Sequence, residues 1–242
     1  MKLWGSSDIG VVRQENQDTY MLHELEDGAL LVVCDGMGGA KGGSTASSTA
    51  SHAFAEAVEQ GYQKNMKPSE MADLVALAAT KANAAVYQAA RQDPSLSGMG
   101  TTLVCLLAQG MDAIVGNIGD SRAYLIDEEG MRQVTHDHSL VAEMVRRGEL
   151  SSREASRHPN KNVITRALGV ESNVSCDVFP LSLKKGQYVL LCSDGLTNEV
   201  SEPEIYYEVF QSQAPERACD TLIEIARSRG GHDNITVVLA SF

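Results

Sequence analysis

Four aspartates in this chain stand where an apolar run ends or is about to begin. They are Asp35 after "LLVVC", Asp120 after "AIVGNIG", Asp194 after "VLLCS" and Asp233 before "NITVVLA". Short apolar runs of this kind are typical of strands, and strand ends gather at the edge of an antiparallel sheet. Four carboxylates at one edge would repel one another strongly in a medium of low dielectric constant. A fold tolerates such a cluster when cations hold it together.

The ligand atoms that these residues offer indicate which cation would bind. Carboxylates and backbone carbonyls are hard oxygen ligands, which suit Mg²⁺ or Mn²⁺ and not zinc. Glycines lie beside three of the aspartates, at Gly36, Gly119 and Gly195, and a glycine allows a carbonyl to approach a metal closely. Asp-Gly is also a common turn dipeptide, so each aspartate alone is more simply a turn residue. The fourfold recurrence favours a metal site, with Asp35 as both a turn residue and a ligand.

The amino-acid composition excludes several classes of protein. The 242 residues are 43% hydrophobic, which is enough for a substantial core in one domain. A net charge of −12 and a pI near 4.9 weigh against sequence-independent nucleic-acid binding, which needs clustered lysines and arginines. No apolar run approaches the length of a bilayer span, and the opening "MKLWGSSDIG" lacks the apolar stretch of a secretory signal. We therefore expect neither nucleic acid nor a membrane among the partners.

The five cysteines point to a reducing compartment. Cys34, Cys105 and Cys192 sit inside apolar runs, where cysteine usually packs as a small hydrophobe. The chain contains no CxxC pair, so neither a zinc site nor a disulfide framework is indicated. A cytoplasmic location is the simplest setting for these thiols.

Six β-rich runs and three helical stretches supply the elements that would position the aspartates. The runs cover residues 29–34, 101–108, 112–118, 121–126, 188–193 and 234–242. Helices are expected at 44–60, where small hydroxyl residues can cap the start, at 69–92 with Ser69 as N-cap, and at 215–228, ended by Gly230 and Gly231. Strands at both ends with helices between them predict an α+β fold of antiparallel sheets covered by helices.

Eight short motifs occur in order along the chain. They are "ENQD", "VCDGMGG", "GTT", "GNIGDSRAYL", "DHSL", "ITRALG", "LLCSDGLTN" and "HDNITVV". In this order they resemble the metal-dependent protein phosphatases, the PPM family of type 2C serine/threonine phosphatases, in its compact bacterial branch. The resemblance runs from about Ser7 to the last strand. It implies a central antiparallel β-sandwich flanked by helices on both faces (αββα), with a metal centre at one edge of the sandwich.

The resemblance also implies one phosphatase domain over residues 1–242, with a flap subregion at about residues 145–166. This polar, weakly periodic segment is our candidate for substrate selection. The implied enzyme hydrolyses phosphoserine and phosphothreonine on proteins with water activated at a binuclear Mg²⁺ or Mn²⁺ centre. Its partners would be phosphorylated proteins and a cognate bacterial serine/threonine kinase, and the chain is expected to be a monomer.

Metal-binding roles carry over to the residues that match the motifs. Asp35 matches the aspartate that bridges two metals, and Gly36 matches the residue that gives one of them a backbone carbonyl. Asp194 and Asp233 match further ligands of the binuclear centre. Asp120 matches the aspartate that, with Asp194, holds a third ion in bacterial members. The resemblance therefore implies two or three ions.

Two further residues take catalytic roles from the resemblance. Asp18, in "ENQD", resembles the acidic residue that orients metal-bound water, and Arg13 resembles the arginine that grips the substrate phosphate. A guanidinium suits that role because its N–H groups fork onto phosphate oxygens. From the residues alone, Arg13 is more simply a surface charge paired with Glu15. The chain has no C-x5-R loop, which argues against a cysteine nucleophile.

The motifs do not identify a general acid for the leaving group. Some family members carry a histidine near the first metal aspartate, and Met37 and Ala40 occupy those positions here. The candidates by default are His23, His52 and His232, each more simply a surface or capping residue. His138 in "DHSL" is interpreted as structural. Hydrogen bonds that shape the site are expected from Thr101, Thr102, Asn117, Ser121 and Asn234.

Two other functions stay open on the sequence. A pseudophosphatase would use the site as a binding module, although a non-catalytic copy has no need for four clustered carboxylates. A metal-dependent hydrolase of small phosphoesters would keep the same centre. Turnover of phosphopeptides compared with small esters distinguishes that enzyme from a protein phosphatase.

Overall fold

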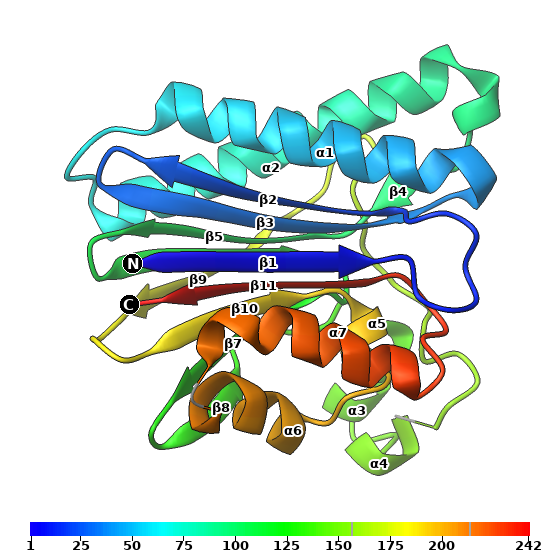
Figure 1. Cartoon of the computed structure of the whole chain (residues 1–242). Helices are drawn as coiled ribbons and strands as arrows, with labels where there is room; N and C mark the ends of the chain where they lie inside the picture. Colours follow the sequence, from blue (N-terminus) through cyan, green and yellow to red (C-terminus); the bar gives the residue numbers. More distant parts are fainter. Residues whose placement is uncertain (156, 213) are drawn as a thin grey trace.

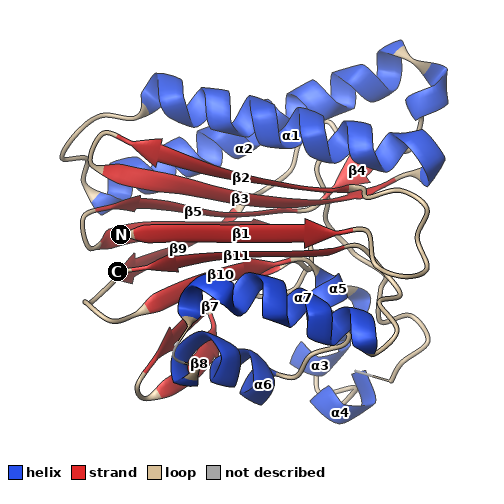
Figure 2. Ribbon diagram, viewed as in Figure 1, coloured by secondary structure: helices blue, strands red, loops and turns tan. Residues whose placement is uncertain are grey.

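Two antiparallel sheets lie face to face between two layers of helices (Figure 1). The computed structural model describes residues 1–155, 157–212 and 214–242, with the side chains of residues 40, 41 and 152 left out. Every ladder between the described strands is antiparallel. Figure 2 shows the four layers in one view, with helices above the upper sheet and below the lower one. The predicted α+β sandwich with helices on both faces is confirmed.

The strand order brings both ends of the chain into one sheet. The first sheet has the order β1 (Lys2–Asp8), β11 (Ile235–Ser241), β10 (Tyr188–Cys192), β7 (Arg122–Asp127) and β8 (Gly130–Gln133). The second has the order β2 (Asp18–Leu25), β3 (Gly28–Met37), β5 (Leu103–Gln109), β6 (Asp112–Ile118) and β9 (Asp177–Ser182), and β4 (Gly100–Thr101) pairs with the end of β3. β1 and β11 pair along their length, with Asp8 opposite Ile235. The loop after β1 therefore lies beside the residues that precede β11.

Helices cover the outer face of each sheet. α1 (Gly39–Gly61) and α2 (Pro68–Gln92) lie over the second sheet (Figure 1). α7 (Ala218–Ser228) lies over the first sheet, together with α6 (Glu202–Tyr206) and the π-helical turn η2 (Tyr207–Gln211). The shorter elements are η1 (Pro94–Leu96), α3 (Leu140–Arg146), α4 (Ser152–Ala155), α5 (Asp194–Thr197) and η3 (Pro215–Arg217). None of the helices in the described part of the chain has the length and apolar character needed to span a bilayer.

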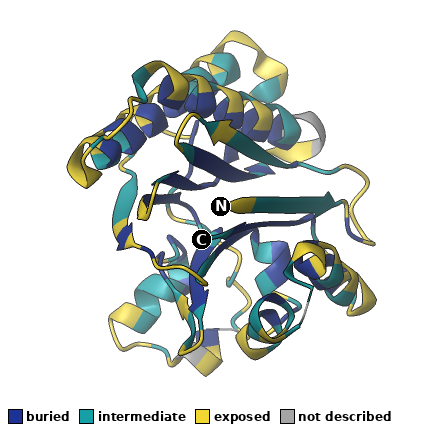
Figure 3. Cartoon of the chain, turned by 60° about the vertical axis from the view of Figure 1, so that its left-hand side comes forward, coloured by how far each residue is buried: buried dark blue, intermediate teal, exposed yellow. Residues whose placement is uncertain are grey.

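The core forms three layers because strand side chains alternate between the two faces of a sheet. In β3, Leu30 and Val32 pack with the layer of α1 and α2, whereas Leu31 and Val33 pack between the two sheets. A third cluster fills the space between the first sheet and α7. Figure 3 shows these buried residues along the strands and the inner faces of the helices. A strand buried on both faces is apolar throughout, which explains the continuous runs that predicted the inner strands.

The strands that the sequence pattern does not predict are mainly the outer ones. β1 and β8 form the edges of the first sheet, and β2 and β9 form the edges of the second. Most of their residues are only half buried. Such strands lack the continuous apolar run of a buried strand. Asp18 is the first residue of one of these edge strands, β2.

Two helix starts differ from the prediction by several residues. α1 begins at Gly39, ahead of the expected start at residue 44. Ser44 is therefore not a cap, and its hydroxyl donates to the Glu15 carboxylate at 2.9 Å. α7 begins at Ala218, because the predicted first residues form the separate 3₁₀ turn η3. The two glycines predicted to end this helix follow it with positive φ angles of 133° and 50°.

The start of α2 shows a different N-cap from the predicted Ser69. The helix begins at Pro68, and its N-cap is Lys67. Proline suits the first helical position because its missing N–H would have no intrahelical partner there. Glu70 accepts the Lys67 backbone N–H at 2.7 Å, so the polar contact at this helix start comes from a carboxylate and not from the Ser69 hydroxyl.

The segment at residues 145–166 is mostly loop. The end of α3 and the short α4 are its helical parts among the described residues, and residue 156 lies outside them. The segment returns alongside the start of α3, where the Leu140 N–H donates to the Val163 carbonyl at 2.8 Å. Ser139 and Ile164 form an isolated antiparallel bridge at the same place. This contact brings residues 162–164 to the end of the sandwich at which β3 and β6 finish.

Candidate metal centre

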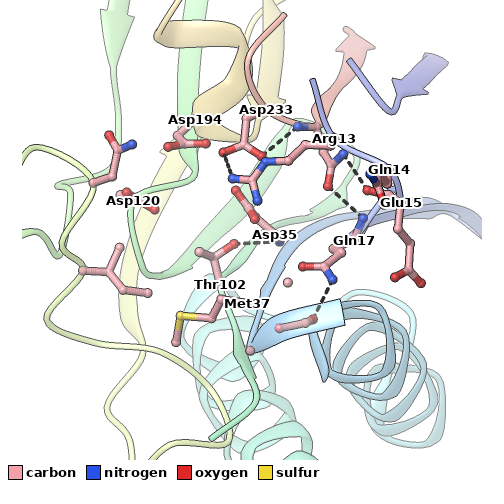
Figure 4. A pocket seen from close by; sticks show the side chains of 16 residues that line it. Arg13, Gln14, Glu15, Gln17, Asp35, Met37, Thr102, Asp120, Asp194 and Asp233 are labelled. Carbon is pink, nitrogen blue, oxygen red and sulfur yellow. Dashed lines mark hydrogen bonds and ion pairs between the residues drawn. The ribbon is translucent and has the colours of Figure 1, made fainter. Parts of the chain in front are cut away.

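A cavity of about 770 Å³ opens at one end of the sandwich (Figure 4). Six of the seven predicted site residues line it, and they are Arg13, Asp35, Gly36, Asp120, Asp194 and Asp233. These residues lie as far as 220 positions apart in the sequence. The seventh, Asp18, is paired with Asp35 across β2 and β3 and is not part of the lining.

Strand ends from both sheets deliver the four aspartates. Asp35 lies near the end of β3, and Asp120 follows the end of β6, both in the second sheet. Asp194 is the first residue of α5 and follows β10, and Asp233 precedes β11; both of these strands belong to the first sheet. The carboxylates therefore enter the cavity from both sheets.

Asp35 is not a turn residue, and the turn interpretation is wrong at this position. β3 continues through Met37 and pairs with β4, with Gly36 opposite Thr101. The Asp35 N–H donates to Thr102 Oγ1 at 2.9 Å. The Asp35 carbonyl accepts the Thr102 N–H and the Thr101 hydroxyl, each at 2.9 Å. A dipeptide preference does not detect this pairing because the partner strand lies far along the chain.

Gly36 is required by close packing. A methyl group in place of its hydrogen would come 2.1 Å from the Gly43 carbonyl oxygen and 2.6 Å from the Gln17 carbonyl oxygen. The Gly36 N–H donates to that Gln17 carbonyl at 3.2 Å. Gly36 therefore lets β3, the first turns of α1 and the loop before β2 meet at the cavity wall.

Burial and mutual repulsion raise the pKa values of the clustered carboxyls. The pKa of Asp35 lies well above its ordinary value, first because the group is buried and then because of the charges of Asp18 and Asp194. Burial and the charge of Asp194 raise the pKa of Asp120 to about 8. Burial and the charge of Asp233 raise the pKa of Asp194. Without a cation, the cluster would hold protons at neutral pH.

The available ligand atoms fit a divalent cation that prefers oxygen. Asp194 Oδ1 is buried without a hydrogen-bond partner, whereas Oδ2 accepts from Asn198 Nδ2 at 3.0 Å. An unpaired buried oxygen is costly, and a cation would satisfy it. Among the residues that the structure describes, no group of three or more Asp, Glu, His or Cys side chains is placed to hold a metal ion by itself. Mg²⁺ characteristically keeps several waters and takes one or two carboxylates per ion, so an open site of this kind suits it.

Asp18 lies opposite Asp35 in the β2–β3 ladder and is held from the first sheet. Its Oδ2 accepts hydrogen bonds from the hydroxyls of Ser193 and Thr236, each at 2.7 Å. Its Oδ1 is buried without a partner. Burial raises the pKa of Asp18 to about 7, although the two hydroxyls act in the opposite direction. The sequence does not predict that Ser193 and Thr236 bind Asp18. Their only distinguishing feature in the sequence is that they lie close to Asp194 and Asp233.

Arg13 forms an ion pair at the rim of the cavity. Its Nη2 donates to Asp233 Oδ2 at 2.7 Å, and half of the Arg13 side chain is exposed (Figure 4). The pairing with Glu15 considered from the sequence is wrong, because Glu15 accepts the Ser44 hydroxyl instead. The paired strands β1 and β11 explain the result, since they place the loop that carries Arg13 beside Asp233.

Hydrogen bonds of Asn234 hold that loop in place. Its Oδ1 accepts the Gln17 N–H at 2.8 Å, and its Nδ2 donates to the carbonyls of Ile9 and Glu15 at 2.9 and 3.0 Å. On the other side of the cavity, the hydroxyls of Thr102 and Ser121 are 2.7 Å apart. The structuring roles expected of these polar residues agree with the contacts that they make.

No histidine lies among the described residues that line the cavity. His23 pairs with Glu59, the ring of His52 contacts the Ser48 carbonyl, and His232 pairs with Glu199. Met37 lines the cavity, while the Ala40 side chain lies outside the described part. The structure therefore brings none of the three default candidates for a general acid into the site.

Other residues line the cavity to which the sequence assigned no role of their own. They are Gln14, Gln17, Gly38, Gly39, Asn162 and Ile164. Asn162 and Ile164 belong to the segment at 145–166, so this segment supplies part of the cavity wall. Ile164 begins the motif "ITRALG", but the motif does not show that Asn162 and Ile164 reach the cavity, because their approach depends on the return of that segment beside α3.

The sequence of this chain is similar to those of known proteins. The family model of protein phosphatase 2C matches residues 10–226. The serine/threonine phosphatase stp of Listeria innocua is 38% identical over 234 residues, which cover 96% of this chain and 92% of that protein.

Solved structures show the same fold. The serine/threonine phosphatase Stp1 from Staphylococcus aureus superposes with a TM-score of 0.93 at 33% identity, covering 100% of this chain and 94% of that chain. The catalytic domain of the phosphatase PstP, in complex with two manganese ions, gives a TM-score of 0.86 at 32% identity, covering 99% and 97%. Sequence and fold agree along nearly the whole length, and the chain belongs to the protein phosphatase 2C family.

Proposed function

We propose that this chain hydrolyses phosphoserine and phosphothreonine on proteins, with water activated at a pair of Mg²⁺ or Mn²⁺ ions. The observation that carries the proposal is the cavity in which four aspartates gather from both sheets. Buried like charges of this kind are costly unless cations neutralise them. Membership of the family and the manganese ions in the PstP structure support the use of divalent metals.

Five residues would hold the ions. Asp35 would bridge two of them, with Asp194, Asp233 and the Gly36 carbonyl as further ligands. Asp120, beside Asp194, would hold a third ion. When bound, the ions lower the pKa of water so that hydroxide is available near neutral pH, and they offset charge on the phosphoryl oxygens.

Arg13 would bind the substrate phosphate. Its guanidinium lies at the rim of the cavity, half exposed and paired with Asp233. An exposed ion pair contributes little stability, so the side chain can exchange this partner for a phosphate. The planar guanidinium then donates two parallel N–H groups to two phosphoryl oxygens. This arrangement fixes the phosphorus in the cavity beside the aspartates.

Asp18 would orient the attacking water. Ser193 and Thr236 anchor one of its carboxylate oxygens, and the other oxygen has no partner. A carboxylate held from one side can accept a hydrogen bond from water on the other. The water oxygen bonds to phosphorus as the bond from phosphorus to the serine or threonine oxygen breaks on the opposite side. The departing oxygen would take its proton from a water molecule, since no histidine lies among the described lining residues.

The setting of the reaction is part of the proposal. A serine/threonine kinase would supply the substrates, because its product is the bond that this enzyme breaks. All five cysteines are free and four are buried, which supports a reducing cytoplasm as the location. Residues 1–242 would act as one domain and as a monomer, with residues 145–166 as a flap. The match of the family model to residues 10–226 supports a single phosphatase unit.

The experiment compares phosphate release from peptides bearing phosphothreonine, phosphoserine or phosphotyrosine and from p-nitrophenyl phosphate. Each is assayed with Mn²⁺, with Mg²⁺ and with EDTA. We expect metal-dependent release from the first two peptides, with a higher kcat/KM than for the small ester. Release from the small ester alone would identify a small-phosphoester hydrolase. Folded protein that binds Mn²⁺ but releases no phosphate would identify a binding module.

A further inference from the structure

His138 connects two parts of the cavity wall that are distant in the sequence. Its backbone N–H donates to the Gly119 carbonyl at 2.9 Å, and its carbonyl accepts the Thr165 N–H at 2.8 Å. Gly119 precedes Asp120, and Thr165 follows Ile164, and both of these neighbours line the cavity. His138 therefore lies between the loop of Asp120 and the returning end of the segment at 145–166.

The His138 ring is fixed in one tautomer. Nδ1 lies 3.0 Å from the Gly119 nitrogen and accepts its hydrogen. A backbone N–H can only donate, so Nδ1 carries no hydrogen and Nε2 carries it. Nε2 lies 3.1 Å from Asp177 Oδ2 and donates to it. The residue is buried, and burial lowers the pKa of His138, which agrees with a neutral ring.

Gly119 depends on these hydrogen bonds for its position. Its φ angle is +106°, which side chains rarely adopt, and a β-carbon there would lie 2.6 Å from Thr102 Cγ2. Only glycine fits, but glycine is also the residue with the greatest freedom to adopt other conformations. Both polar groups of Gly119 bond to His138, and Asn117 Nδ2 adds a longer contact to the carbonyl at 3.3 Å. Bonds to His138 therefore fix the peptide that leads into Asp120.

The ring is held in turn from its other side. Asp177, the first residue of β9, uses Oδ1 to accept from Arg166 Nη1 at 2.6 Å and Oδ2 to accept from His138. The contacts thus run without a gap from Arg166 through Asp177 and His138 to Gly119. A histidine whose second nitrogen meets a carboxylate cannot rotate without losing that bond.

We propose that His138 is a positioning residue for Asp120. Its ring holds the Gly119 peptide so that the Asp120 carboxylate stays beside Asp194 in the cavity, where the two can share a divalent cation. The inference rests on the proposed function, because it takes Asp120 as a metal ligand. His138 does not line the cavity and acts through Gly119. Outer-shell partners of metal ligands typically change metal affinity by about 10- to 100-fold.

Two substitutions separate the two contacts of the ring. His138→Asn places an amide oxygen near the position of Nδ1, so it keeps an acceptor for the Gly119 N–H. His138→Gln places an amide nitrogen near the position of Nε2, so it keeps only the contact with Asp177. Titration calorimetry of the full chain with MnCl₂ measures the affinities. We expect His138→Gln to weaken the most weakly bound Mn²⁺ by about 10-fold, and His138→Asn to weaken it less.

A double variant tests whether the effect passes through Asp120. In an Asp120→Asn background, His138→Gln should cause no further loss of Mn²⁺ affinity, because both changes disable the same ligand. An equal loss in that background, or wild-type affinity in His138→Gln, would overturn the inference and leave the proposed function intact. A wild-type chain that binds no Mn²⁺ would overturn both.

Thermal unfolding shows whether each variant is folded. If His138→Gln does not fold, Asp177→Asn serves in its place, because it leaves the ring present and removes the carboxylate charge that Nε2–H and Arg166 both meet. We expect Asp177→Asn to lower Mn²⁺ affinity by less than the loss expected for His138→Gln. In the Asp120→Asn background, Asp177→Asn should cause no loss. Unchanged affinity in Asp177→Asn would overturn the inference.

Discussion

Asp18 and Asp35 lie directly opposite each other across β2 and β3. Residues paired in this way point to the same face of the sheet, with β-carbons about 5 Å apart, and like charges there are destabilising. The charge of Asp18 adds to the burial that raises the pKa of Asp35. A fold keeps such a pair when protons or cations neutralise it. The stability of the chain should therefore depend on pH and on bound metal ions.

The metal-free chain should lose stability as the pH rises from about 4 to about 8. The folded-state pKa values are about 7 for Asp18 and about 8 for Asp120, against an ordinary value of 3.8. Within that window the folded state holds protons that the unfolded chain has released, so the free energy of unfolding falls with pH. Thermal unfolding in EDTA at several pH values measures the fall.

The comparison of wild type with Asp120→Asn isolates this effect from other titrating groups. The variant has lost one of the carboxyls whose pKa is raised, so its free energy of unfolding should fall less steeply across the same window. Mn²⁺ should raise the thermal unfolding midpoint of the wild type most at the highest pH of this window, because the ion binds the deprotonated, folded form. A steeper fall in the variant would contradict the assignment.

Arg13→Lys should lower kcat/KM for a phosphothreonine peptide by about 10-fold, which corresponds to the loss of one charged hydrogen bond of about 1.4 kcal/mol. Lysine keeps the charge but cannot donate two parallel hydrogen bonds. Steady-state kinetics give the ratio, and Mn²⁺ affinity should not weaken. Arg91→Lys on α2 is the matched control, since Arg91 lies over the Tyr87 ring outside the cavity. Equal kinetics for both variants would argue against phosphate binding by Arg13.

Ser193→Ala should destabilise the chain by about 1–3 kcal/mol, the usual cost of leaving a buried polar group without its partner. The fully buried Ser193 hydroxyl donates to Asp18 and accepts the Thr236 N–H at 3.0 Å. Urea denaturation measures the change. The control is Ser228→Ala, whose hydroxyl is exposed and contacts only the Ile225 carbonyl. A Ser193→Ala variant as stable as this control would show that Asp18 does not depend on that hydroxyl.

Ile164→Ala should lower kcat/KM for phosphopeptides more than for p-nitrophenyl phosphate. Ile164 lines the cavity from the segment at 145–166, which is our candidate for selecting the peptide around the phosphate. Parallel assays of the two substrates give the ratio. Exchange of the whole segment should change the preference among phosphopeptides and spare small-ester turnover. Equal losses on both substrates would count against a role in substrate selection.

The inner strands and the aspartates at their ends are predictable because burial on both faces produces long apolar runs. β3 and β10 illustrate the case, since each run stops close to Asp35 or Asp194. The edge strands are not predictable in this way, because half-exposed strands mix polar and apolar residues. For this reason no local sequence pattern indicates that Asp18 begins β2.

Contacts between distant segments account for the rest of the unpredicted site. The partner of Arg13 is Asp233 rather than Glu15, because the pairing of β1 with β11 decides which acid lies nearby. Ser193 and Thr236 meet at Asp18 only after both sheets are stacked. Local patterns indicate which residue types could bind a metal, but they do not indicate which hydroxyl or guanidinium stands next to them.

The most direct test of the metal centre is phosphate release from a phosphothreonine peptide by wild type and by Asp35→Asn, each with Mn²⁺ and with EDTA. Asn keeps the size of Asp35 but removes the charge that would bridge two ions. We expect Mn²⁺-dependent release by the wild type, loss of release in EDTA, and little or no release by a folded Asp35→Asn chain at any Mn²⁺ concentration. Equal release by the two proteins, or release by the wild type that EDTA leaves unchanged, would contradict the metal centre.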